Sequence, residues 1–319
     1  MSAEHGHEHH HHHNPLKPHS HDPADAIDSA LESNAQGIRA VKISLVVLGV
    51  TAIAQLAIVL VSGSVALLAD TVHNFSDALT AVPLWVAFAL GRRAATRRHT
   101  YGFGRAEDLA GLFVVLMIAL SAVVAAVESI RRLFEPQPLE HVGWVLVAGV
   151  VGFVGNEIVA IYRIRVGRRI GSAALVADGV HARADGFTSL AVVLGAVGVM
   201  LGFPLADPIV GIVISVAIVV LLVGAVKSIG ARLMDAVEPA KVDAVEHALA
   251  ETPGVLSASE VRLRWVGHRL EGSARVIVAD SSLSAAEVVA HAAEHAAEHA
   301  VPGLDRFDIR LAAQAQATP

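Results

Sequence analysis

The strongest constraint on the fold is a series of six long apolar stretches between residues 40 and 230. An α-helix needs about 20 residues to cross the hydrocarbon core of a bilayer, and these stretches have that length. Hydrophobic residues make up 54% of the chain and charged residues 17%, which is too apolar for an ordinary soluble domain. We therefore expect an α-helical membrane protein with six transmembrane helices, at residues 40–62, 65–90, 108–130, 142–162, 173–201 and 208–230.

The arginines are distributed unevenly between the two sets of predicted loops. The loops after the second and fourth stretches are arginine-rich, whereas the opposite loops contain only Arg131 and Arg132. Positively charged loops stay on the cytoplasmic side, so six spans place both termini in the cytoplasm. The abundance of Ala, Val, Gly and Arg over Lys is typical of a GC-rich bacterial genome and favours the plasma membrane. The loop after the fourth stretch is expected to hold Arg163, Arg165, Arg168 and Arg169.

Both ends of the chain differ in composition from the apolar middle. Residues 1–35 are polar and histidine-rich, which predicts a disordered cytoplasmic tail that binds metal by composition rather than by geometry. Beyond the transmembrane domain, residues 36–232, we expect an amphipathic helix, an alternating strand, a second strand, an alanine-rich helix and a third strand. Their order, α-β-β-α-β, predicts a small cytoplasmic α+β domain at residues 233–315, followed by a short tail at 316–319. These helices are expected at 240–251 and 284–300, and the strands at 261–265, 274–279 and 307–311.

One pattern of ionisable residues occurs twice, in the second and the fifth apolar stretches. It reads Asp-x-x-His-x-x-x-Asp at residues 70–77 and again at 178–185. Residues four apart share a helix face. Two such helices packed together would therefore present two imidazoles and two carboxylates to one point. The predicted metal ligands are His73, Asp77, His181 and Asp185.

The first aspartate of each copy, Asp70 or Asp178, precedes its histidine by three residues and shares the same face. These two carboxylates are candidates for outer-shell partners of the metal site, or for the lining of the ion path. An ionisable group at mid-bilayer costs about 2.5–3.5 kcal/mol, so each of these residues calls for a functional reason. Hydrogen bonding between helices and a proton relay without metal are the alternatives.

The ligand set also narrows the choice of ion. Two imidazoles and two carboxylates suit tetrahedral Zn²⁺, and Co²⁺, Cd²⁺, Fe²⁺ and Mn²⁺ are further candidates. A metal requires neutral histidine and ionised aspartate, so protons compete with it for the same side chains. The pattern therefore predicts a membrane protein that exports zinc in exchange for protons.

A second group of histidines lies in the alanine-rich segment 284–300. His291, His295 and His299 are spaced four apart and form a candidate low-affinity cytoplasmic metal site, or else a solvated face of acid–imidazole pairs. The same segment contains His-x-x-Glu-His twice, a pattern found in zinc peptidases. A membrane zinc peptidase and a non-transporting metal sensor are thus the alternative functions. Elsewhere, His268 is expected among loop or surface residues.

The residues around the repeat resemble the cation diffusion facilitator family of metal transporters over residues 36–315. The resemblance rests on the two His-x-x-x-Asp pairs and on the segments 63–70, 101–107 and 136–138. It implies a homodimer, here resembling a bacterial zinc transporter, that exports divalent cations by alternating access. No enzymatic activity and no nucleic-acid partner are expected. The resemblance also implies a charge contact between Arg105 and Asp235 that links the two domains.

Overall fold

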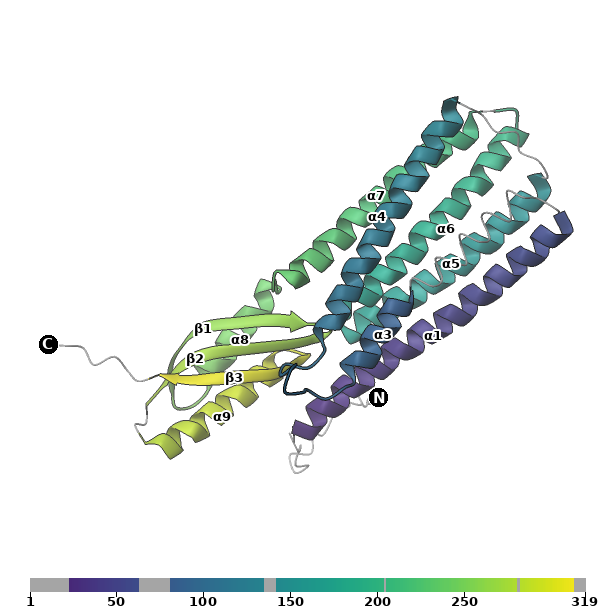
Figure 1. The fold of residues 1–319 in the computed structure, drawn as a ribbon. Coiled ribbons are helices and arrows are strands. Elements are labelled where there is room, and N and C mark those ends of the chain that lie inside the picture. Colours follow the sequence, from purple (N-terminus) through teal and green to yellow (C-terminus); the bar gives the residue numbers. More distant parts are fainter. Residues whose placement is uncertain (1–22, 63–80, 135–141, 204, 280–281, 313–319) are drawn as a thin grey trace, which may run out of the picture.

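The computed structural model describes residues 23–62, 81–134, 142–203, 205–279 and 282–312, with side chains from residue 31 onward. A bundle of long helices runs along one direction, and a small three-stranded sheet with two helices lies at one end of it (Figure 1). The described bundle helices are α1 (Pro23–Ser62), α3 (Ala81–Gly91), α4 (Arg105–Phe134), α5 (Val142–Ile170), α6 (Ala173–Met200) and α7 (Ala206–Leu233).

Five of the described helices, α1 and α4 to α7, are long and apolar enough to cross a membrane. Helix α3 is the described end of the expected second span, whose residues 65–80 lie outside the described part of the chain. Large aliphatic side chains such as Leu60 (76% exposed) and Val220 (67% exposed) cover the outside of the bundle. Such a surface suits lipid rather than water. The predicted membrane class is confirmed.

Helix α6 lies inside the bundle and packs against α4, α5 and α7. Small residues allow its close contact with α5. A Cβ atom added at Gly179 would lie 3.0 Å from the backbone nitrogen of Ile164 and 3.1 Å from the carbonyl oxygen of Ala160. A glycine is therefore needed for the two backbones to approach this closely.

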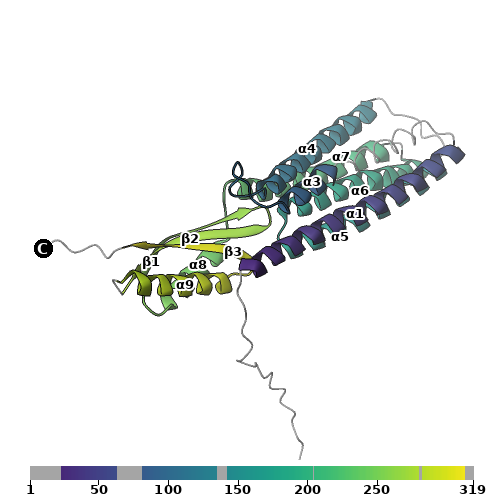
Figure 2. The ribbon, with the colours of Figure 1, turned by 60° about the horizontal axis from the view of Figure 1, so that its bottom comes forward.

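The C-terminal domain follows the predicted order α-β-β-α-β. It consists of α8 (Pro239–Glu251), β1 (Val255–Val266), β2 (Arg269–Val278), α9 (Leu283–Ala300) and β3 (Leu304–Ala312). Strands β1 and β2 form an antiparallel hairpin, and β3 pairs with β2 in parallel after the α9 crossover. Helices α8 and α9 lie on the same face of the sheet (Figure 2). They enclose a core that includes Val245, Leu249, Leu270, Val276 and Phe307.

Two expected boundaries are wrong. Residues 163–170, expected in a loop, form the last two turns of α5, because Arg163 is buried against α6 while Arg165, Arg168 and Arg169 stay exposed. In the sequence, a helix end with one buried arginine and three exposed ones has the same pattern as a charged loop. Helix α1 begins at Pro23, inside the segment 1–35 that was expected to be disordered.

Candidate functional site

The described half of the predicted metal site lies on α6, in the interior of the bundle. His181 and Asp185 are 1% and 9% exposed, and His181 Nδ1 lies 3.7 Å from Asp185 Oδ1. With metal–ligand distances of about 2.0–2.2 Å, two ligand atoms of a tetrahedral ion lie roughly 3.3 Å apart. The two side chains are thus placed to share one ion after a small adjustment.

The other predicted ligands, His73 and Asp77, lie outside the described residues, as does Asp70. Within the described ranges no group of three or more histidine or acidic side chains is close enough to hold a metal ion. Helix α6 therefore contributes a pair of potential ligands, and the convergence of four remains a prediction.

Asp178, expected near the metal or on the ion path, contacts an arginine. Its Oδ2 atom lies 2.9 Å from Nη1 of Arg163 on α5, and the two side chains are 0% and 2% exposed. This is a fully buried ion pair between two membrane-spanning helices. It lies one helical turn before His181, toward the end of the bundle that carries the C-terminal domain.

A second ion pair joins the same two helices. Arg183 of α6 donates from Nη2 and Nε to the carboxylate of Glu157 on α5, at 2.6 and 3.2 Å. Both side chains are about a quarter exposed. Glu157 is an acidic residue within an apolar stretch, and that signal in the sequence could have identified it.

Two further buried polar side chains lie beyond Asp185. Ser189 lies one turn further along α6. Gln55 of α1 donates from Nε2 to the carbonyl oxygen of Ala148 on α5. Both reach the space over Gly152, where an added Cβ would lie 2.9 Å from Ser189 Oγ and from Gln55 Nε2. This polar row extends the His181–Asp185 pair toward the end of the bundle opposite the C-terminal domain.

The two domains meet through a network of polar contacts. Arg105 Nη2, at the start of α4, donates to Asp235 Oδ1 at 2.8 Å, which is the charge contact that the family resemblance implies. Arg232 of α7 donates to the carbonyl oxygens of Gly171 and Gly267, at 2.9 and 2.8 Å. The contacts reach both the α5–α6 turn and the β1–β2 turn, so the sheet is fastened to several membrane helices.

His268 was expected to be a loop or surface residue, and this is wrong for its side chain. It lies in the β1–β2 turn but is 7% exposed, because the turn is packed against α4, where Nδ1 of His268 lies 2.7 Å from Glu107 Oε2. The neighbouring Gly267 has a φ angle of 63°, which the turn requires and which a residue with a side chain rarely adopts. Sequence reasoning missed this contact because the partners are far apart in the chain.

The histidines of α9 lie on the surface of the C-terminal domain. His291 is 88% exposed, and the rings of His295 and His299 meet edge to face with 4.4 Å between their centroids. Glu294 accepts a hydrogen bond from the backbone N–H of Ile309 at 3.0 Å, which fastens α9 to β3. That contact engages one of the two carboxylates, Glu294 and Glu298, that could serve a peptidase as its general base.

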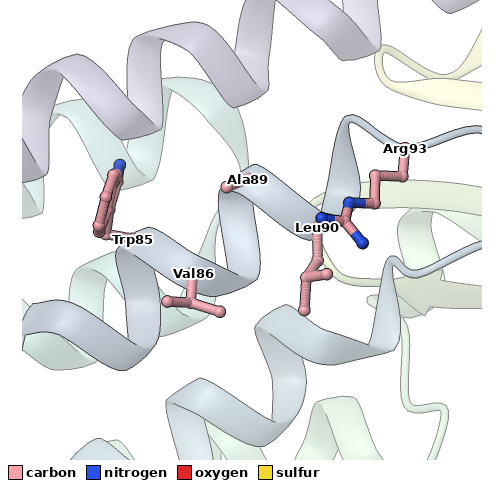
Figure 3. A pocket seen from close by; sticks show the side chains of 5 residues that line it. All are labelled: Trp85, Val86, Ala89, Leu90 and Arg93. Carbon is pink, nitrogen blue, oxygen red and sulfur yellow. The ribbon is translucent and has the colours of Figure 1, made fainter.

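A shallow groove lies along α3 (Figure 3). Its lining consists of Trp85, Val86, Ala89, Leu90 and Arg93. These side chains include neither an imidazole nor a carboxylate, so the groove offers no ligands to a divalent cation. The candidate site is therefore the pair on α6, and not this groove.

The chain is similar to known membrane transporters over most of its length. Residues 41–234 match the cation efflux transmembrane domain, and residues 237–307 match the cytoplasmic domain of cation efflux proteins. A probable cation efflux system protein of Mycobacterium tuberculosis is 63% identical over 289 residues, which cover 90% of this chain and 87% of the relative.

The names of more distant relatives give different metals as the substrate. The manganese efflux system protein MneS of Bacillus subtilis is 25% identical over 64% of this chain and 70% of its own. The zinc transporter ZitB of Pectobacterium atrosepticum is 32% identical over 49% of this chain and 48% of its own.

Proposed function

Because the chain belongs to the cation efflux family of membrane transporters, we propose that it exports divalent cations, zinc foremost, from the cytoplasm in exchange for protons. The observation that carries the proposal is the buried pair His181 and Asp185 on the central helix α6. An imidazole and a carboxylate inside a membrane bundle are costly unless they serve a substrate. His73 and Asp77 would complete a tetrahedral set from the second span.

Zinc is the favoured substrate because of the ligand chemistry. A site with two imidazoles suits Zn²⁺ better than a hard ion such as Mg²⁺, which prefers oxygen ligands. Imidazole and carboxylate also bind Mn²⁺, Co²⁺, Fe²⁺ and Cd²⁺, and the named substrates of the relatives include both zinc and manganese. We place zinc first and manganese among the competitors.

Proton exchange follows from the same ligands. An unperturbed imidazole titrates at about pH 6.5, so protons and metal compete for histidine close to neutral pH. In alternating access, the site would load metal on the cytoplasmic side and release it when protons from the other side replace it. The polar row of Ser189 and Gln55 supports an exit in that direction.

The arrangement of charge supports the proposed orientation. The exposed arginines Arg92, Arg97 and Arg168 all lie at or near the helix ends that adjoin the C-terminal domain, whereas Arg131 lies at the end of α4 that points away from it. Positive residues favour the cytoplasmic side, so this end of the bundle and both termini are proposed to face the cytoplasm of the cell. The C-terminal domain is proposed to join two copies of the chain as a homodimer.

The test is metal uptake into inside-out membrane vesicles, with and without an acid-inside pH gradient. We expect zinc uptake that the gradient accelerates and that Asp185→Asn reduces by at least about tenfold, since even outer-shell changes at metal sites cost that much. Asp308→Asn is the matched control, because its carboxylate lies on β3 and is 59% exposed. Uptake that does not depend on the gradient would contradict proton exchange. Equal uptake by Asp185→Asn and Asp308→Asn would contradict the proposed metal site.

The same vesicles separate the alternatives. A metal sensor would bind zinc without moving it into the vesicles. A peptidase would depend on Glu294 or Glu298 and not on Asp185. Zinc uptake that is lost in Asp185→Asn but kept in both Glu294→Gln and Glu298→Gln would therefore argue against that interpretation.

A further inference from the structure

The buried ion pair between Arg163 and Asp178 has no role in the function proposed so far. Its atoms Nη1 and Oδ2 are 2.9 Å apart, and both side chains are withdrawn from solvent. Removing two charges from water is expensive, and packed apolar residues join helices at lower cost. Helices α5 and α6 already have such a contact beside the pair, where Gly179 meets the backbone of Ala160 and Ile164. Holding two helices together is therefore a weak reason for the pair.

The position of Asp178 gives a better reason. It precedes His181 by three residues on α6, so the two side chains share a helix face and lie one turn apart. Asp178 is on the side of His181 that adjoins the C-terminal domain. A cation that reaches His181 and Asp185 from that side would pass a third carboxylate.

Arg163 lies against one oxygen of that carboxylate, Oδ2, which is 2.9 Å from its Nη1 atom. Among the described residues, no hydrogen-bond acceptor lies within reach of Nε or Nη2 of Arg163, so its charge is committed to Asp178 alone. The pair is neutral as a whole. It thus presents the cation with neither an extra ligand nor an extra positive charge.

We propose that Arg163 is a specificity-determining residue that withholds Asp178 from the transported cation. This inference rests on the proposed function of metal export. With Arg163 in place, the ion meets imidazoles and the carboxylates of the two His-Asp pairs. If Arg163 is lost, Asp178 becomes a further oxygen ligand with a full negative charge.

The added oxygen ligand would change selectivity in a definite direction. Oxygen ligands favour harder ions such as Mn²⁺ over Zn²⁺. Tighter binding of the ion on the loading side also slows its release. Loss of Asp178 is expected to weaken the binding of the cation instead. Arg163 would then be an uncompensated positive charge beside the route of that cation.

The two halves of the pair therefore predict opposite effects. Arg163→Met is expected to lower the KM for Mn²⁺ and to raise manganese uptake relative to zinc by about tenfold, the lower range seen when groups around a metal site are changed. Asp178→Asn is expected to raise the KM for Zn²⁺ by about tenfold. The double variant Arg163→Met/Asp178→Asn removes both charges and is expected to return KM and selectivity close to those of the wild type.

The experiment is the vesicle assay with zinc and manganese, on the full chain and with equal amounts of folded protein confirmed by size-exclusion chromatography. Arg163→Lys is the conservative control, because a lysine keeps the charge that engages Asp178 and is expected to keep the wild-type selectivity. A pair that serves only the fold would make both single variants and the double variant lose uptake together, with the zinc-to-manganese ratio unchanged. That result would overturn the inference.

Two further outcomes keep the test decisive. If Arg163→Met does not fold, the inference is tested by the double variant and by Asp178→Asn. An unchanged or lowered KM for zinc in Asp178→Asn overturns the inference. Wild-type protein that moves none of the metals would overturn the proposed function instead. The two failures are thus observed in different samples.

Discussion

The imidazole of His268, in the turn between β1 and β2, lies 2.7 Å from the carboxylate of Glu107 in the first turn of α4. The side chains are 7% and 6% exposed. The N–H of the adjacent Gly267 donates to Asp108 Oδ2 at 3.3 Å, so one turn of the sheet engages two consecutive carboxylates of a membrane helix. Contact between the domains at this point is therefore specific and shielded from water.

Replacement of His268 by alanine is expected to loosen this contact. It would leave the Glu107 carboxylate buried without its imidazole partner, and such an orphaned group costs about 1–3 kcal/mol. Thermal unfolding of the purified protein in detergent should show a lowered Tm, and hydrogen exchange should rise at the β1–β2 turn.

His247→Ala is the matched control for that change. His247 pairs with Glu251 on α8, but the two side chains are 75% and 70% exposed, and exposed pairs contribute little. Its Tm should stay close to that of the wild type. Equal Tm values for the two alanine variants would show that the contact with Glu107 does not fasten the domains.

Arg232 is expected to matter more for stability than Arg105, although Arg105 makes the charge contact implied by the family. Arg232 donates to two backbone carbonyls from different domains, and its guanidinium lies 4.0 Å from the centroid of the Trp265 ring. Arg105 and Asp235 are 43% and 48% exposed, and pairs of that kind are worth about 0–1 kcal/mol. Arg232→Ala should therefore lower the Tm further than Arg105→Ala. The reverse order, measured in the same detergent, would contradict this assignment.

The stability of the C-terminal domain is expected to depend on Asp305. Burial raises the pKa of its carboxyl group above the ordinary 3.8, and the positive charge of Arg269 opposes this only in part. A carboxyl group whose pKa is raised by folding stabilises the fold at low pH, and this contribution is lost as pH rises through the raised value. Asp305→Asn should thus be more stable than the wild type at neutral pH, and the difference should shrink as pH falls toward about 4.

Scans of Tm at several pH values measure this difference. Asp308→Asn, at an exposed carboxylate of the same strand, is the control and should follow the wild type at each pH. An advantage of Asp305→Asn that grew on acidification would show that folding lowers the pKa of this carboxyl group instead of raising it.

The sequence predicted the elements well because their signals are local. Apolar runs of bilayer length locate α4, α6 and α7 to within a few residues, and the alternation at residues 261–265 locates part of β1. The pair of His181 and Asp185 was also predicted, because a four-residue spacing fixes a common face on any helix. These inferences need no knowledge of which helix lies next to which.

Contacts between distant residues could not be predicted in the same way. From the sequence alone, Arg163 is interpreted as a loop arginine and His268 as a turn residue. The structure shows that Arg163 contacts Asp178 of α6 and that His268 contacts Glu107 of α4. In both cases the partner decides whether a charged side chain is buried. A pattern along one segment carries no information about that partner.

The close approach of α5 and α6 at Gly179 provides the last prediction. An added Cβ would lie 3.0 Å from a backbone nitrogen and 3.1 Å from a carbonyl oxygen of α5, and neither atom can move without shifting the helix. Gly179→Ala should therefore separate the helices, weaken the ion pair beside them and reduce metal uptake, although alanine favours a helix over glycine by about 1 kcal/mol. Gly224→Ala on α7 is the control, because an added Cβ there meets nothing within 4 Å. It should leave uptake unchanged and raise Tm slightly, so a loss of uptake in Gly179→Ala alone isolates the packing of α5 on α6 as the cause.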